Sequence, residues 1–323
     1  MPLDELRSTL EAVHAWCDRR GIEFGCFPMH EVAAHPQAPD VIRLFAQHDR
    51  MPAPYQPFTT TGVPLATRDD WREVLEAVRM TGSNTVWMAI HGLAEEHDRQ
   101  VGRSGAFKET CTAVGRVHDV GMTVGCNVFV TNTNVDCASQ IAEALIELAV
   151  EEQSWQPADY YPHARARRNE KLRPVVSDVL AIAGNIGAWS TLYREHWAAI
   201  KSWTEGAWVQ RAMSGSWPRF ESDVDFGLLL VLRPNLDLHF GRAGDYSERY
   251  GNLRRDGIDA VFEAALAAAE RSVDEIWFRP TELLPIAEAA RHGNPEGEGI
   301  HFSADSVRFL WLDRARRRDL PRQ

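Results

Sequence analysis

The stretch that decides the fold runs from Ser83 to Asp136 and reads SNTVWMAIHGLAEEHDRQVGRSGAFKETCTAVGRVHDVGMTVGCNVFVTNTNVD. An apolar run from Thr85 to Ile90 leads into a polar loop, which extends from His91 to Gly105. A helix-patterned segment, Phe107 to Val120, ends at a glycine and precedes a second apolar run, Val124 to Val130. This order predicts a βαβ unit. Continuous apolar runs are typical of strands that are covered on both faces, as in a parallel sheet.

The N-terminal half of the chain repeats this unit. Strands are predicted to begin near residues 22, 55, 84 and 123, a spacing of about 30 to 40 residues that indicates a parallel sheet or a (β/α) barrel. Helices are expected at Leu3–Arg20, Asp40–Gln47, Trp71–Met80 and Cys137–Val150, with one more strand around Asp159–Tyr161. In such barrels the chemistry lies on loops after the strands. Here those loops carry His30, Glu31, Thr61, His91, Asn132 and His163.

The repeat stops after Arg173. The segment from Val175 to Gln210 has a helical pattern and is rich in tryptophan, which we interpret as packing. Phe226–Leu232 and Leu236–Phe240 predict a β-hairpin, followed by an alanine-rich helix from Asp256 to Arg271. We therefore place a domain boundary near residue 215 and expect two domains, residues 1–215 and 216–323.

Composition excludes several classes of protein. The chain has 323 residues and a net charge of -11, which argues against general nucleic-acid binding because that needs clustered positive charge. No apolar stretch reaches the roughly 18 residues of a membrane span, and the start lacks the pattern of a secretory signal. The five cysteines form no CxxC pair. We expect reduced thiols and a cytoplasmic protein that binds neither nucleic acid nor membrane.

Five short segments stand in or beside the predicted strands and loops. They are Phe27–Pro36 (FPMHEVAAHP), Thr61–Leu65 (TGVPL), Ala89–Gly92 with Glu96-His97-Asp98, Tyr161–Ala166 (YPHARA), and Leu232–Leu238 (LRPNLDL) with Gly251-Asn252-Leu253. In order, they resemble the GGEP loop, the TNG loop, the fourth strand with its loop, the sixth-strand segment and the SPASM hairpin with its GNL in the radical S-adenosylmethionine (SAM) superfamily. The resemblance implies an α/β fold: a partial (β/α) barrel of the radical SAM type with a small C-terminal α+β SPASM-like domain.

The chain departs from this family in its cysteines. The CxxxCxxC loop that defines the family is absent, and three thiolates must converge to hold a [4Fe-4S] cluster. The chain also begins at the helix that would follow this loop, and the region from Ser216 onward has no cysteine. Either the protein is a naturally cluster-free, degenerate relative, or the chain lacks an N-terminal piece. We favour the cluster-free interpretation and expect no [4Fe-4S] cluster in this chain.

The resemblance also implies a cofactor site for SAM. Glu31 keeps the acidic residue of the GGEP loop, although His30 and Val32 replace its glycine and proline. By position, Thr61, Asn127 and Arg165 complete the predicted cofactor-binding set of Glu31, His30, Thr61, Asn127 and Arg165. The guanidinium of Arg165 could pair with a carboxylate. The catalytic residues are not predicted.

A metal site is the alternative use of the same loops. His30, Glu31 and His35 lie in one loop, and His91 follows a neighbouring strand. Two histidines and a carboxylate suit a mononuclear iron or zinc centre. The spacing is not HExxH, so one helix would not align the two imidazoles. We predict no metal, and name His30, His35 and His91 as the side chains that would form such a site.

Three functions are consistent with these patterns. The first is a radical-SAM-fold protein without its own cluster, a pseudoenzyme that binds a peptide or small molecule in natural-product or peptide-modification metabolism, as the partner of another enzyme. The second is an active radical SAM/SPASM peptide-modifying enzyme whose cluster loop is missing from this chain. The third is a cluster-independent enzyme that uses SAM or a metal at the barrel mouth. We rank them in this order.

Overall fold

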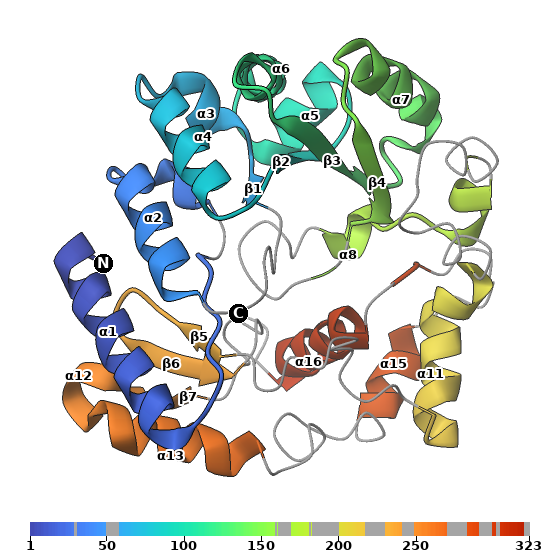
Figure 1. The fold of residues 1–323 in the computed structure, drawn as a ribbon. Coiled ribbons are helices and arrows are strands. Elements are labelled where there is room, and N and C mark those ends of the chain that lie inside the picture. The colour runs from blue at the N-terminus through green and yellow to red at the C-terminus, as the bar shows by residue number, and fades with distance from the viewer. Residues whose placement is uncertain are drawn as a thin grey trace. The chain divides into compact units, whose positions relative to one another are not determined.

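The structure of the protein is a computed structural model. It describes residues 1–28, 31–49, 58–158, 160, 169–180, 182, 200–216, 230–240, 249–269, 283–290, 299–301 and 304–319 (Figure 1). The predicted site residues His30 and Arg165, and the loop residue His163, lie outside this part of the chain.

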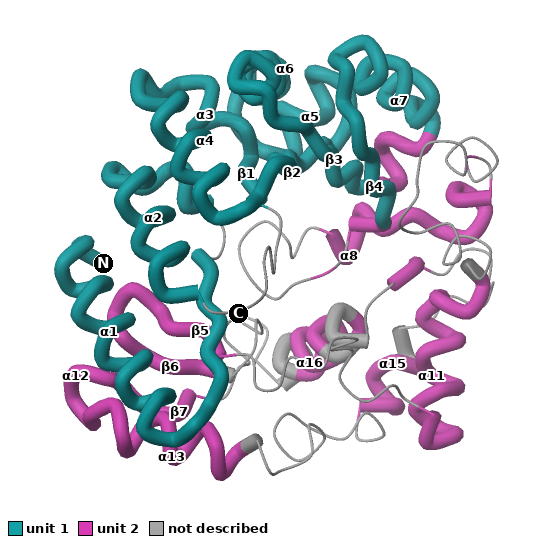
Figure 2. Tube along the Cα trace, viewed as in Figure 1, with its two compact units in different colours: residues 1–129, 136–156, 185–193 teal, residues 130–135, 157–184, 194–323 magenta. Residues whose placement is uncertain are grey.

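The chain divides into two compact units that alternate along the sequence (Figure 2). Unit 1 comprises residues 1–129, 136–156 and 185–193. Unit 2 comprises residues 130–135, 157–184 and 194–323. The predicted domain boundary near residue 215 falls within unit 2, and the division at that residue stays a prediction.

The main sheet has four parallel strands in the order β1-β2-β3-β4. They are β1 (Phe58–Thr60), β2 (Thr85–Ile90), β3 (Thr123–Val130) and β4 (Glu152–Pro157). Phe58 is in register with Val86, and Val86 with Val124. The α/β class and the two apolar strands of the opening stretch are thus confirmed.

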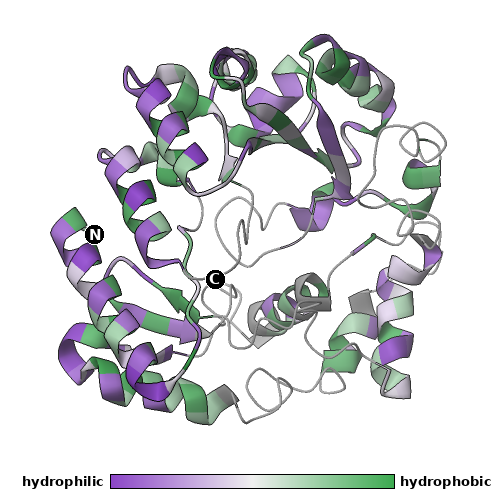
Figure 3. Cartoon of the chain, viewed as in Figure 1, coloured by the Kyte–Doolittle hydropathy of each residue, from purple (hydrophilic) through white to green (hydrophobic). Residues whose placement is uncertain are grey.

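Helices precede and follow these strands. They are α1 (Leu3–Arg20), α2 (Ala38–His48), α3 (Val63–Thr67), α4 (Trp71–Met80), α5 (Ala94–Val101), α6 (Ala106–Asp119) and α7 (Ala138–Glu147), with short 3-10 turns η1 (Val32–Ala34) and η2 (Val135–Cys137). Figure 1 shows α3, α4, α6 and α7 on one side of the sheet, and Figure 3 shows hydrophobic and hydrophilic residues in each of them. Such amphipathic helices bury one face against a sheet.

Two local predictions are wrong. The predicted strand from Ile22 to Phe27 has no regular structure. The polar stretch after His91 was predicted as a loop, yet it contains α5, whose glutamates and arginine are good helix formers. The strand predicted around Asp159–Tyr161 falls mostly outside the described residues, and the fourth described strand of the sheet is Glu152–Pro157. The helix expected at Asp40–Gln47 begins earlier, at Ala38, so Asp40 lies in its first turn.

The two faces of the main sheet differ because successive side chains of a strand point to opposite sides. On the helix face lie the fully buried Val86, Met88, Val124, Cys126 and Val128. The far face carries Trp87, Ala89, Gly125, Asn127 and Phe129. Apart from Trp87 and Gly125, these far-face positions are only half-buried.

Unit 2 contains a small antiparallel sheet in the order β5-β6-β7. The strands are β5 (Leu230–Leu232), β6 (Asp237–Phe240) and β7 (Arg249–Asn252), followed by α12 (Leu253–Asp256) and α13 (Ile258–Ala269). Leu230 pairs with Phe240, so the predicted hairpin is confirmed. The third strand, β7, lies between this hairpin and the predicted helix and was not predicted.

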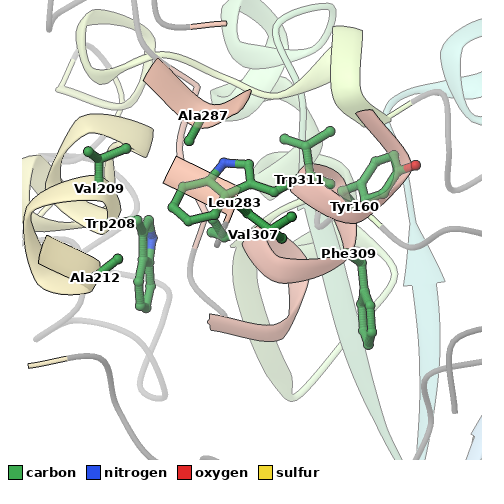
Figure 4. Packing of buried hydrophobic residues seen from close by; sticks show 10 residues of the cluster. Tyr160, Trp208, Val209, Ala212, Leu283, Ala287, Val307, Phe309 and Trp311 are labelled. Carbon is green, nitrogen blue, oxygen red and sulfur yellow. The ribbon is translucent and has the colours of Figure 1, made fainter. Parts of the chain in front are cut away.

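The core of unit 2 is built from four helices, three of which carry one tryptophan each. They are η4 (Ile200–Trp203), α11 (Glu205–Ser214), α15 (Leu284–Ala290) and α16 (Ala304–Asp319), and a four-residue helix, α8 (Asn169–Leu172), lies outside this group. Tyr160, Trp208, Phe309 and Trp311 are buried together with small aliphatic residues of these helices (Figure 4). Trp203 packs on Trp208 with ring centroids 5.7 Å apart, which supports the interpretation that these tryptophans of the Val175–Gln210 segment serve packing.

Candidate functional site

The candidate site lies where neighbouring parallel strands end. β1 ends at Thr60 and β2 at Ile90, and these strands are in register, so Thr61 and His91 follow at the same edge of the sheet. Ligands of parallel α/β proteins bind at the carboxyl edge of the strands. All residues of this site belong to unit 1.

The carboxylate of Glu31 is fixed to the end of β1. Its Oε1 accepts a hydrogen bond from Thr60 Oγ1 at 2.7 Å, and its Oε2 accepts one from the backbone N–H of Thr61 at 2.5 Å. Glu31 is half-buried and Thr60 is 6% exposed. The structure therefore brings together two of the predicted cofactor-binding residues, Glu31 and Thr61, which are separated by 30 positions in the chain.

The turn after β1 is fixed from its other side as well. Gly62 has a φ of 82°, which favours glycine, and its N–H donates to Thr60 Oγ1 at 3.1 Å. A Cβ on Gly62 would stand 3.2 Å from the Cα of Thr110 in α6. The hydroxyl of Thr110 donates to the carbonyl of Thr61 at 3.1 Å. The backbone that receives Glu31 is thus held by α6.

His91, directly after β2, carries a neutral imidazole. Its ring stacks on Phe129 of β3, with ring centroids 5.1 Å apart and planes inclined by 15°. Burial, with a smaller contribution from the neighbouring His97, lowers the pKa of His91 to about 4. At neutral pH the ring can donate from one nitrogen and accept at the other.

His97 of α5 supports His91 from behind. The backbone N–H of His91 donates to Nδ1 of His97 at 3.3 Å, and the rings of His97 and Phe107 meet edge to face. His97 is 2% exposed, and burial lowers its pKa, although Asp98 acts in the opposite direction. This histidine therefore serves as a fixed hydrogen-bond acceptor in the structure.

The far face of the sheet carries two aromatic residues near His91, namely Phe129, on which His91 stacks, and Trp87. A Cβ on Gly125 would lie 2.5 Å from the indole of Trp87, so the glycine makes room for this ring. Asn127, the third predicted cofactor-binding residue in the described part of the chain, stands between these residues and Phe129. It is half-buried and in register with Ala89 of β2.

Two of the three histidines named for a metal site, His35 and His91, lie in the described part of the chain, and each has another contact there. The imidazole of His35 accepts a hydrogen bond at Nδ1 from the N–H of Gln37, at 3.1 Å. His91 stacks on Phe129, as described above, and His30 lies outside the described residues. Across the described ranges, no group of three or more histidines, cysteines, aspartates or glutamates has the arrangement of a metal site.

The cysteines do not form a cluster-binding group either. All five are free, and they are distributed over α1, the segment after it, α6, β3 and η2: Cys17, Cys26, Cys111, Cys126 and Cys137. Burial raises the pKa of Cys26 and of Cys126 to about 12, and raises that of Cys17 and Cys111. A cluster needs three thiolates that converge on it, and in the described ranges no group of three or more cysteines, histidines, aspartates or glutamates has such an arrangement. The residues present do not fit a [4Fe-4S] cluster.

Several residues that carry the family resemblance have structural roles. Asp98 accepts hydrogen bonds from the N–H groups of Gly105 and Phe107, at 2.6 and 2.9 Å, and so fixes the start of α6. These bonds lower the pKa of Asp98. The side chain of Asn252 caps α12 by accepting from the N–H groups of Arg254 and Arg255. The loop residue Asn132 donates to the carbonyl of Lys171 within unit 2.

Comparison with known proteins gives structural likeness alone. No protein-family model matches the chain, and no curated protein matches its sequence. One similar solved structure is histidine-tagged anSMEcpe with bound AdoMet, which is 13% identical with a TM-score of 0.49; the match covers 95% of this chain and 88% of that one. Another is native anSMEcpe with bound AdoMet and Kp18Cys peptide, which is 12% identical with a TM-score of 0.42; the match covers 86% of this chain and 78% of that one. Likeness at this level assigns neither a family nor an activity to this chain.

Sequence reasoning missed several residues of the site. Thr60, Trp87, Gly125 and Phe129 lie within strands, where their apolar or β-forming character signals only secondary structure. The glycine inside β3 is the one signal that could have been used, because such a glycine often marks a close approach.

No helix in the described part of the chain is both long and apolar enough to cross a bilayer.

Proposed function

We propose that this chain is a radical-SAM-type protein without its own iron–sulfur cluster, which binds SAM at the carboxyl edge of β1 and β2. In this proposal it acts on, or presents, a peptide or small molecule in peptide-modification or natural-product metabolism, as the partner of another enzyme. Two features support the proposal: the ordered series of family-like segments in the sequence, and the parallel sheet that places two of them at one edge.

The observation that carries the proposal is the position of Glu31. A carboxylate has about four lone-pair sites, and the bonds from Thr60 and Thr61 use two of them. The remaining lone pairs are available for the ammonium group of SAM, to which a carboxylate makes strong charge-assisted hydrogen bonds. His91 and Asn127 would supply neutral polar contacts beside it.

The direct test is calorimetry with SAM on the wild type and on Glu31→Gln. The amide keeps the size of the side chain and one oxygen acceptor but loses the charge. We expect the affinity to fall by about 10- to 100-fold, because a hydrogen bond to a charged group contributes about 1.5–3 kcal/mol. Glu73→Gln is the control, since Glu73 lies on the exposed surface of α4 and pairs with Arg43. Equal affinities for the wild type and Glu31→Gln would remove Glu31 from the site.

The cluster-free part of the proposal has a separate test. Protein purified and reconstituted without oxygen is analysed for iron and acid-labile sulfide. We expect neither in stoichiometric amounts, because the five cysteines are dispersed and four of them have raised pKa values. Stoichiometric iron and sulfide in this chain would overturn this part of the proposal, whatever the result with SAM.

A further inference from the structure

The loop that carries Glu31 makes a second set of contacts, at its opposite end. The guanidinium of Arg68, the residue that follows α3, faces three backbone carbonyls of this loop. Its Nη1 donates to the carbonyls of Ala33 and His35, at 3.0 and 2.6 Å, and its Nη2 donates to that of Pro36 at 3.2 Å. These carbonyls belong to the turn that directly follows Glu31.

Asp70 orients this guanidinium. Nε and Nη2 of Arg68 donate to the two carboxylate oxygens of Asp70, each at 2.7 Å. A guanidinium has five N–H donors in a planar fork, and all five of those of Arg68 have an acceptor. The side chain of Arg68 is 14% exposed, and the hydrogen bond from Arg68 lowers the pKa of Asp70. A lysine could not reproduce this set of bonds.

The backbone of Arg68 is in turn held by helix α6 of unit 1. Arg116 of α6 donates from Nη1 to the carbonyls of Leu65 and Arg68, at 2.6 and 3.2 Å, and its guanidinium lies over the ring of Trp71. Since Thr110 of α6 also holds Thr61, the same helix supports both attachment points of the Glu31 loop.

We infer that Arg68 is a positioning residue for the ligand site: it fixes the turn from Ala33 to Pro36 and thereby holds the carboxylate of Glu31 at the end of β1. Arg68 does not contact the ligand. Its effect passes through the loop backbone, with Asp70 holding the guanidinium in its orientation. The identity of the ligand rests on the proposed function, whereas the positioning role rests on the contacts between Arg68 and the loop.

The test combines amide hydrogen exchange with calorimetry on the full chain. The variants are Arg68→Ala, Arg68→Lys and Asp70→Asn, with Arg43→Ala as the control. Arg43 lies in α2, soon after the loop, and pairs only with the partly exposed Asp40 and Glu73 in the described structure. The exchange readout is the peptide that contains the bonded N–H groups of Ala34, His35 and Ala38.

We expect Arg68→Ala to raise exchange in this peptide by at least about tenfold and to weaken SAM binding by about tenfold, as the loss of a charge-assisted network predicts. Arg68→Lys keeps the charge and should recover little of either effect, whereas added methylguanidinium should restore both in Arg68→Ala. Arg43→Ala should resemble the wild type. If Arg68→Ala does not fold, the comparison of Arg68→Lys and Asp70→Asn with Arg43→Ala decides.

The outcomes separate the two claims. Unchanged exchange in the Arg68 variants overturns the positioning role. Raised exchange with an unchanged SAM affinity overturns its connection to the ligand site. If the wild type binds no SAM, the proposed function fails, and the exchange data alone decide whether Arg68 holds the loop.

Discussion

The indole of Trp87 on β2 occupies the space where a side chain at Gly125 on β3 would stand, since a Cβ there would lie 2.5 Å from Cδ2 of the ring. The two residues are in register on neighbouring parallel strands. The ring is 7% exposed and lies on the same face of the sheet as Asn127 and Phe129. This pair makes the far face of the sheet sensitive to a single methyl group.

Gly125→Ala should therefore destabilise the protein by about 1–3 kcal/mol, the usual cost of overpacking a core. Gly115→Ala is the matched control: Gly115 lies in α6, where an added Cβ meets nothing within 4 Å. It should stabilise by roughly 0.5–1 kcal/mol, because alanine is the better helix former. Urea denaturation measures both. A neutral Gly125→Ala would show that the indole has another position of equal energy.

The double variant Trp87→Leu/Gly125→Ala separates packing from strand propensity. If the two residues compete for one space, the double variant should lose less than the sum of the single variants, by about 0.5–3 kcal/mol, as expected for residues in contact. Strict additivity would contradict the direct contact.

Glu205 should be the most sensitive charged residue of unit 2. Its carboxylate is 4% exposed and accepts hydrogen bonds from Trp311 Nε1, at 3.0 Å, and from Arg314, with Arg173 at 3.9 Å. Glu205→Gln leaves the buried guanidinium of Arg173 and the partly buried one of Arg314 without their shared anion, so we expect a loss of about 3–5 kcal/mol. Glu170 also pairs with Arg314 but is more exposed than Glu205, so Glu170→Gln should cost only about 1 kcal/mol or less. Equal losses in urea denaturation would contradict this ranking.

Acid should destabilise the protein through His91. Its folded-state pKa is about 4, against about 6.5 in the unfolded chain, so the unfolded state binds more protons below pH 6.5. The stability that the neutral ring contributes is present above pH 6.5 and is lost as the pH falls toward 4, with a slope of up to about 1.4 kcal/mol per pH unit. His91→Phe keeps the stack on Phe129 and should flatten this profile. An unchanged slope in denaturation between pH 6.5 and 4 would exclude this role.

His301 acts in the same direction within unit 2. It is fully buried, and its Nε2 is hydrogen-bonded to Arg173, so burial and this neighbouring charge lower its pKa well below the ordinary value. A single histidine variant should therefore flatten the pH profile only in part.

Asn252, which is half-buried, should contribute to stability at the end of β7. Its Oδ1 caps α12, and its Nδ2 donates to Asp237 at 2.9 Å and to the carbonyl of Asn235 at 2.8 Å. Asn252→Ala should cost about 1–2 kcal/mol through the lost cap. Asn252→Asp keeps the cap acceptor but places a second carboxylate beside Asp237, so it should not be better than alanine. Calorimetric melting compares the two, and a harmless Asn252→Asp would show that the cap alone matters.

The sequence predicted β2 and β3, each of which has one fully buried face, and α1 and α4 with their full bounds, because the apolar pattern is strongest there. It failed for β4, since EQSWQP has few apolar residues and its strand character depends on pairing with β3. Ile22–Phe27 shows the converse: an apolar composition alone does not make a strand.

The site was predictable in its location but not in its contacts. The rule that ligands bind after parallel strands selected Thr61 and His91 correctly, whereas it selected Glu31 because that residue follows Ile22–Phe27, which is not a strand. The bond from Glu31 to Thr61 depends on how a loop returns to a strand 30 residues later, and no local pattern encodes it. Arg68 escaped notice for the same reason, because its acceptors are backbone carbonyls, which carry no signature in the sequence.

Several hydrogen bonds of unit 2 join residues that are far apart in the sequence, so they form late during synthesis at the ribosome. Tyr160 donates to Asp313, Glu170 binds Arg314 and Arg173 binds His301, across separations of 153, 144 and 128 residues. By contrast, β1, β2 and β3 lie within one short span of chain and can pair once Val130 has emerged. In the nascent chain, Arg173 therefore lacks its contact with His301, and Glu170 its contact with Arg314, until those two residues have been added, and in that interval water or a chaperone takes the place of these contacts.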